Sequence, residues 1–163
     1  MEILYFIQES GEKMIYQALS QNTILLNESA IDWGEAAKKA GGLLLDNQSI
    51  KKEYIADMIA SVHEFGPYIV IAPGIALFHA RPEGNVNEIC LSLLTLEKPI
   101  EFGAGDKDPV DLLFALGAVD HDSHLQLMAE LMKILKDGQL VERIRTATDA
   151  KKVLEMIKKK LEE

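Results

Sequence analysis

The chain has 163 residues, of which 48% are hydrophobic, and a formal net charge of −9. This length fits one globular domain over residues 1–163, and the negative charge disfavours nucleic acid as a partner because it repels a phosphate backbone. No stretch approaches the roughly 18 consecutive apolar residues of a membrane helix, and the N-terminus lacks a basic, cleavable leader, so we expect a soluble, cytoplasmic protein. The single cysteine, Cys90, excludes an internal disulfide and a cysteine cluster for zinc.

The first half of the chain predicts helices around one short strand. Residues 1–10 are compatible with either a strand or a helix, residues 12–20 suggest a short helix, and residues 23–27 suggest a short strand. Residues 32–48 and 51–66 carry helical periodicity and end near glycine or polar breaks.

The second half predicts the centre of a sheet. Short apolar runs bounded by turn residues occupy 68–72, 88–96 and 111–119, as is typical of buried strands. Helical periodicity returns from residue 123 and continues to an amphipathic terminal helix at 151–163. Since helices precede and follow the strands, we predict a single α/β domain with a central mixed sheet and helices packed on both faces. The apolar side of the terminal helix could pack on its own domain or on a second chain, which leaves a homo-oligomer open.

The four histidines occupy positions where side chains often meet. His63 lies at the end of a predicted helix, His79 follows a strand and a turn, and His121 and His124 lie between a strand and a helix. In open α/β folds, strand ends and helix starts converge on clefts, so a shared site is a reasonable hypothesis. The alternatives are ordinary hydrogen-bonded histidines, with His121 and His124 as solvated cap residues and His63 as a favourable charge at a helix C-terminus.

The residue types suit phosphoryl chemistry. A neutral imidazole nitrogen is a competent nucleophile, which makes His79 a candidate to carry a group covalently. Ser123 and Gln126 fit a capping box, which places His124 in the first turn of a helix, where the dipole favours an anion and disfavours protonation. A neutral His124 could then donate a hydrogen bond to a phosphoryl group. Arg81 could pair with a phosphate or an acidic partner.

Other readings of these residues also stand. A zinc site could be built from Asp120, His121 and His124, although their spacing matches no familiar ligand pattern. A small hydrolase or metal enzyme that uses these residues is therefore a further hypothesis. Cys90 lies in an apolar run, where a buried and inert thiol is the default. Gly74 most simply serves the Pro-Gly turn, because no glycine-rich phosphate loop surrounds it.

Two motifs resemble a known family. The segment "GPYIVIAPGIALFHARPEGNV" (66–86) resembles the active-site region of enzyme IIA components of the bacterial phosphotransferase system, in the mannitol/fructose superfamily and its ascorbate branch. In that family a G-I-A-x-P-H-[AG] element carries the phosphorylated histidine, which corresponds to His79. The segment "DPVDLLFALGAVDHDSHLQLMAEL" (108–131) resembles a later strand and helix start, where an assisting histidine corresponds to His124. The resemblance covers about residues 20–160 and is strongest over 66–131.

The resemblance implies a phosphoryl carrier that needs no metal or organic cofactor. A histidine-containing phosphocarrier protein would phosphorylate His79, His124 would stabilise the phosphoryl charge, and a cysteine of an enzyme IIB component would receive the group for a membrane IIC permease. The branch implies ascorbate as the sugar. The alternative is a regulatory module of the same fold whose phosphorylation state another protein senses.

Two departures from the family pattern concern the surroundings of the histidine. Phe78 stands where proline is usual, which frees a backbone N–H and relaxes φ. His63 and Glu64 stand where the wider superfamily often has arginine and glutamate, so both are candidate auxiliary residues together with Arg81. Leu77, Phe78 and Pro82 could form an apolar rim that seats a partner; an equally simple alternative places them in the core, which we favour for Leu77 because it lies in a strand-like run.

Overall fold

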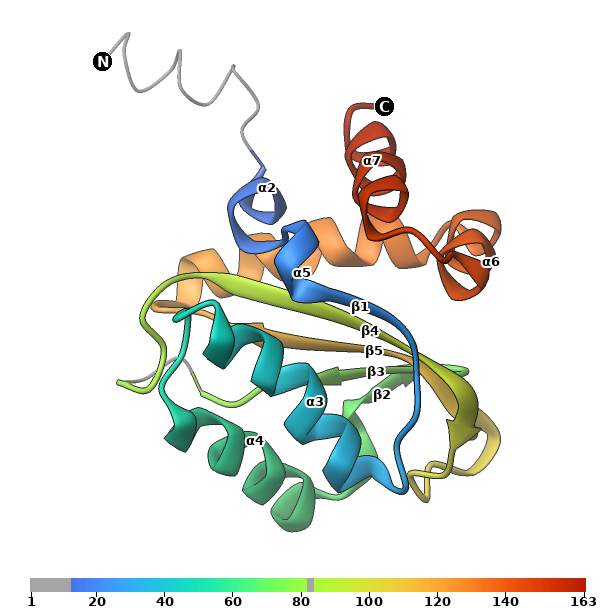
Figure 1. Ribbon diagram of the computed structural model, residues 1–163. Coiled ribbons are helices and arrows are strands. Elements are labelled where there is room, and N and C mark those ends of the chain that lie inside the picture. Colours follow the sequence, from blue (N-terminus) through green and yellow to red (C-terminus); the bar gives the residue numbers. More distant parts are fainter. Residues whose placement is uncertain (1–12, 82–83) are drawn as a thin grey trace, which may run out of the picture.

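A five-stranded sheet organises the computed structural model, which describes residues 13–81 and 84–163 (Figure 1). The prediction for residues 1–10 lies outside the described residues. The helices are α2 (Met14–Ala18), α3 (Trp33–Asp46), α4 (Lys52–Phe65), α5 (His121–Leu135), α6 (Gly138–Thr146) and α7 (Ala150–Leu161). The strands are β1 (Ile24–Glu28), β2 (Val70–Ala72), β3 (Ile75–Phe78), β4 (Cys90–Ile100) and β5 (Val110–Gly117). None of the helices in the described ranges has both the length and the apolar character to cross a membrane.

The sheet is mixed and its strand order is β1-β4-β5-β3-β2. Strands β1 and β4 run parallel, as do β3 and β5, whereas β4–β5 and β2–β3 are antiparallel pairs. Helices α2, α5, α6 and α7 lie on one face, and α3 and α4 lie on the other (Figure 1). The predicted α/β class, with a mixed sheet covered on both faces, is therefore confirmed.

Three local predictions differ from the structure. The apolar run at 75–78 is a strand, β3, whose four residues are all buried and pair with β5. Helix α5 begins at His121, because the Asp120 side chain accepts the Ser123 backbone N–H and so caps the helix three residues before the predicted cap, Ser123. The chain after α5 also forms a separate helix, α6, which Asp137 caps by accepting the N–H of Leu140.

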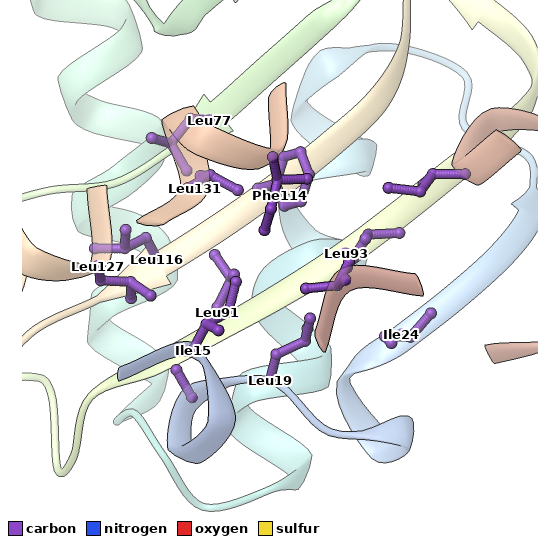
Figure 2. Packing of buried hydrophobic residues seen from close by; sticks show 14 of the residues in the cluster. Ile15, Leu19, Ile24, Leu77, Leu91, Leu93, Phe114, Leu116, Leu127 and Leu131 are labelled. Atoms are coloured by element: carbon purple, nitrogen blue, oxygen red, sulfur yellow. The ribbon is translucent and has the colours of Figure 1, made fainter. Parts of the chain in front are cut away.

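The two central strands are buried on both faces because helices cover each of them. On the α5 side, Leu91 and Leu93 of β4 and Phe114 of β5 pack against Leu127 and Leu131 of α5 (Figure 2). Full burial of each such side chain contributes about 1.5–3 kcal/mol relative to exposure. The apolar side of α7 joins the same core through Val153, Ile157 and Leu161, so the terminal helix packs on its own domain.

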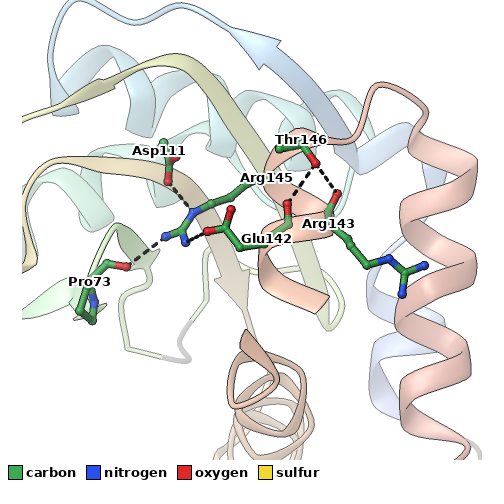
Figure 3. A network of polar contacts seen from close by, with 6 residues as sticks. All are labelled: Pro73, Asp111, Glu142, Arg143, Arg145 and Thr146. Carbon is green, nitrogen blue, oxygen red and sulfur yellow. Dashed lines mark hydrogen bonds and ion pairs between the residues drawn. The ribbon is translucent and has the colours of Figure 1, made fainter. Parts of the chain in front are cut away.

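The start of β3 is held by a polar network (Figure 3). Gly74 has φ +77°, and its carbonyl accepts the N–H groups of Asp111 and Leu112. Arg145 of α6 donates from Nε to Asp111 Oδ1 (2.9 Å) and from Nη2 to the Pro73 carbonyl (3.0 Å). Glu142 accepts a further bond from Arg145 Nη1 at 3.1 Å. These contacts fix one end of the strand whose other end leads into His79.

Candidate functional site

His79 directly follows β3, where the strand leaves the sheet, and its side chain is half-buried. Its Nδ1 lies 3.0 Å from the carbonyl oxygen of Leu77. A carbonyl only accepts hydrogen bonds, so Nδ1 carries the proton in the neutral ring and Nε2 keeps a free lone pair. The local backbone therefore selects the tautomer that leaves Nε2 as a nucleophile.

His124 faces His79 from α5, with a distance of 6.0 Å between the two ring centroids. Its Nδ1 is buried and has no hydrogen-bond partner. Burial lowers the pKa of His124 below its ordinary value, and the nearby His79 and His121 lower it further. Because an orphaned buried N–H is more costly than an orphaned acceptor, the proton of the neutral ring belongs on Nε2.

Asp120 holds the N-terminus of α5 beside these rings. Its Oδ1 accepts the backbone N–H of Ser123 (2.8 Å) and the Ser123 hydroxyl (2.7 Å), and its carbonyl accepts the His124 N–H (3.2 Å). The bonds from Ser123 lower the pKa of the Asp120 carboxyl. The carboxylate proposed as a zinc ligand is thus engaged as a helix cap, and no cluster of three or more metal-ligating side chains occurs within residues 13–81 and 84–163.

A cleft of about 1150 Å³ opens over the two rings, between α4, the segment after β3 and the start of α5. His79, His121 and His124 line it, together with the predicted auxiliary residues Glu64 and Arg81. His63 does not line the cleft, because its ring packs edge-on against Trp33 with 5.1 Å between ring centroids. The structure brings together all but one of the sequence-predicted site residues.

The apolar side chains exposed at the cleft differ from those predicted. Leu77 and Phe78 are fully buried, since β3 is an inner strand of the sheet, so the alternative that places them in the core is confirmed and the rim hypothesis is wrong for both. Pro82 lies outside the described residues. Phe65, Tyr68 and Leu125 line the cleft instead and are 61%, 45% and 52% exposed.

Tyr68 is the member of this apolar group that contacts the histidine. Its ring meets that of His79 edge-on, with 5.7 Å between centroids, and Phe65 packs edge-on against Tyr68 at 6.1 Å. The sequence signal for this pair is the Gly-Pro break at 66–67, which ends α4; the two aromatic residues that flank the break are both exposed.

Cys90 is not part of the site. It is 1% exposed, and its thiol donates to the Gly117 carbonyl (3.7 Å). Burial raises the pKa of the thiol to about 12. The prediction of a buried and inert cysteine agrees with this environment.

Comparison with known proteins gives a consistent group of relatives. The family model described as "Phosphoenolpyruvate-dependent sugar phosphotransferase system, EIIA 2" matches residues 17–160. An ascorbate-specific PTS system EIIA component of Salmonella choleraesuis (strain SC-B67) is 38% identical over 137 residues, which are 83% of this chain and 89% of the relative. The corresponding protein of Escherichia coli (strain K12) is 37% identical over 142 residues, which are 86% of this chain and 92% of the relative.

Solved structures of similar fold point the same way. The mannitol-specific cryptic phosphotransferase enzyme IIA CmtB of Escherichia coli has a TM-score of 0.79 and 32% identity, with 91% of this chain and 99% of that chain covered. The enzyme IIA of a mannitol IIA–phosphorylated IIB complex from Escherichia coli has a TM-score of 0.77 over 86% of this chain and 97% of that chain. At 23% identity, this second likeness shows the fold alone.

Proposed function

Since the chain belongs to the EIIA 2 family of the phosphoenolpyruvate-dependent sugar phosphotransferase system, we propose that it carries a phosphoryl group on His79, which it accepts from a histidine phosphocarrier protein and passes to a cysteine of a IIB component. The observation that carries the proposal is the free Nε2 of His79 beside a neutral His124 in an open cleft. The names of the curated relatives make ascorbate the proposed sugar.

In the proposed step, His79 Nε2 attacks the phosphorus atom of the donor's phosphohistidine. A bond forms between phosphorus and Nε2, and the bond to the donor nitrogen breaks, with its electron pair staying on the donor ring. The attacking ring of His79 gains positive charge, which the Leu77 carbonyl stabilises through the Nδ1–H bond of 3.0 Å. The same bond holds the ring in place, so that little reorganisation is needed.

His124 serves as the donor to the transferring phosphoryl oxygens. Its lowered pKa keeps it neutral, with the proton on Nε2, so it can donate a hydrogen bond to the phosphoryl group without binding it as tightly as a full cation. The N-terminus of α5 adds the partial positive charge of the helix dipole nearby. Arg81 and Glu64 remain proposed auxiliary residues at the cleft, whereas the packing of His63 on Trp33 supports no such role for His63.

The exposed Phe65, Tyr68 and Leu125 support a protein partner over a small substrate as the donor and acceptor. Apolar and aromatic side chains beside a reactive group are typical of the dry centre of a protein–protein interface. Exclusion of water there also protects a labile phosphohistidine from hydrolysis. The IIA–IIB complex of the mannitol system provides a precedent in the same fold for the proposed IIB partner.

Labelling from phosphoenolpyruvate, through enzyme I and the phosphocarrier, tests this proposal. We expect wild type to take up an acid-labile, base-stable label, His79→Ala to take up none, and His124→Asn to label more slowly by about 10²–10³-fold, as for the loss of one transition-state donor. His63→Ala is the matched control and should label like wild type. Absence of label on wild type would refute the proposal, and label that does not pass to a IIB component would favour the regulatory alternative.

A further inference from the structure

The buried residue Tyr54 contacts the backbone next to His79. Tyr54 lies in the first turn of α4, is 1% exposed, and extends its hydroxyl to the sheet. The hydroxyl accepts the backbone N–H of Ala80 at 3.0 Å and donates to the carbonyl of Leu116 at 2.7 Å. A phenolic hydroxyl can do both at once, so one side chain links the segment after β3 to β5.

This link stands where the strand pairing ends. The register of β3 on β5 stops at Phe78, which pairs with Ala115. Ala80 and Leu116 lie one or two residues beyond that pair, and the Tyr54 hydroxyl bridges their backbone groups. The three groups form a chain of hydrogen bonds in a buried setting, where each bond strengthens the next.

His79 therefore sits between two fixed points. Phe78, on its N-terminal side, is held by the sheet, and Ala80, on its C-terminal side, is held by Tyr54. Without the hydroxyl, Ala80 would be free to move with the exposed Arg81 that follows it. The backbone of His79 would then be anchored only on its Phe78 side, although the hydrogen bond between His79 Nδ1 and the Leu77 carbonyl would still hold the ring.

We propose that Tyr54 is a positioning residue for phosphoryl transfer, whose hydroxyl fixes the backbone after His79 so that Nε2 stays directed into the cleft. This inference rests on the proposed function for its catalytic consequence, but its structural content is independent of any phosphocarrier. Burial raises the pKa of the Tyr54 hydroxyl, so the hydroxyl stays protonated and able to donate over the whole working pH range.

The substitution Tyr54→Phe removes only the hydroxyl and tests the inference. A matched control is Thr95→Val, because Thr95 is also 1% exposed and its hydroxyl also accepts a backbone N–H, that of Asn27, at 2.9 Å. Thr95 pairs with Leu112 near the opposite end of β5, away from His79. Tyr54→Phe loses two hydrogen bonds to the backbone and Thr95→Val loses one, so the control shows what a lost bond does away from His79, and the remaining difference in stability is removed by correcting for the folded fraction.

Two readouts are informative. In the ¹⁵N spectrum of the His79 ring, we expect wild type and Thr95→Val to show the Nδ1–H tautomer strongly dominant and Tyr54→Phe to show a mixture of tautomers. In phosphoryl transfer at saturating phosphocarrier, corrected for the folded fraction, we expect the kcat of Tyr54→Phe to fall about ten- to one-hundred-fold, with KM unchanged because the docking surface is intact. Transfer by Thr95→Val should match wild type.

A folded Tyr54→Phe with the wild-type tautomer and wild-type kcat would overturn the inference. If the variant does not fold, exchange of the Ala80 amide hydrogen in wild type decides the matter: protection well above that of the exposed Gly84 amide is expected, and equal exchange would refute the link. If wild type accepts no phosphoryl group, the proposed function fails, while the tautomer and exchange data still test the role of Tyr54.

Discussion

The substitution Gly74→Ala tests how the start of β3 is held. Gly74 has φ +77°, a conformation that costs a residue with a Cβ about 1–2 kcal/mol. The added Cβ would also collide with the guanidinium of Arg145 and displace its bond to the Pro73 carbonyl. Hydrogen bonds to charged groups contribute about 1.5–3 kcal/mol, and the lower end applies because the Arg145 side chain is 20% exposed.

We therefore expect Gly74→Ala to lower the free energy of unfolding by about 3 kcal/mol in urea denaturation followed by circular dichroism. The control is Gly42→Ala in α3, where no atom lies within 4 Å of the added Cβ and helix propensity predicts a gain of about 0.5–1 kcal/mol. In an Arg145→Ala background the collision is absent, so the cost of Gly74→Ala should fall to about 1–2 kcal/mol. An undiminished cost in that background, or a cost below about 0.5 kcal/mol in wild type, would refute this reasoning.

Three further predictions concern individual side chains. The pKa of His124 is lowered in the folded state, so the unfolded chain binds more protons below pH 6.5 and the free energy of unfolding should fall as the pH drops through that value. In urea titrations at several pH values, His124→Asn should flatten this dependence on pH. An unchanged slope in the variant would contradict the assignment. The buried carboxylate of Glu130 accepts the backbone N–H groups of Met14 (3.1 Å) and Ile15 (2.9 Å). Glu130→Ala should therefore lower the free energy of unfolding by about 1–3 kcal/mol and speed amide hydrogen exchange in α2. Unchanged exchange in α2 would contradict the contact. Cys90, with its pKa raised to about 12, should react with a thiol reagent only on unfolding, and stoichiometric labelling of the folded protein would contradict its burial.

Much of the fold could be predicted because the core elements repeat a clear pattern. The run at 111–119 is continuously apolar because β5 is covered by helices on both faces, and the structure places the strand at Val110–Gly117. The helices predicted at 32–48 and 51–66 correspond to α3 and α4, since both carry one apolar side toward the sheet. Strand β3 does not emerge from the sequence pattern, because four residues after a Pro-Gly turn are too few to show a period.

The site could be predicted only as a set of residue types. His79 and His124 were singled out by their positions after a strand and before a helix, but the partner of His79 Nδ1 is the Leu77 carbonyl, a backbone atom that no sequence pattern identifies. The N-cap of α5 could not be identified from the sequence, because Asp120 and Ser123 are both good capping residues and the backbone conformation decides between them. The sequence left open whether Leu77 and Phe78 face solvent or the core, because an apolar residue next to a turn looks the same in either place.

The most direct test of the account is the identity of the phosphorylated atom. Wild-type protein phosphorylated through the phosphocarrier would be examined by ³¹P and ¹⁵N NMR, with His79→Ala as the control. We predict a single phosphohistidine at His79 that carries the group on Nε2, because Nδ1 is bonded to the Leu77 carbonyl. A phosphoryl group on Nδ1 of His79, or on another residue, would contradict the account.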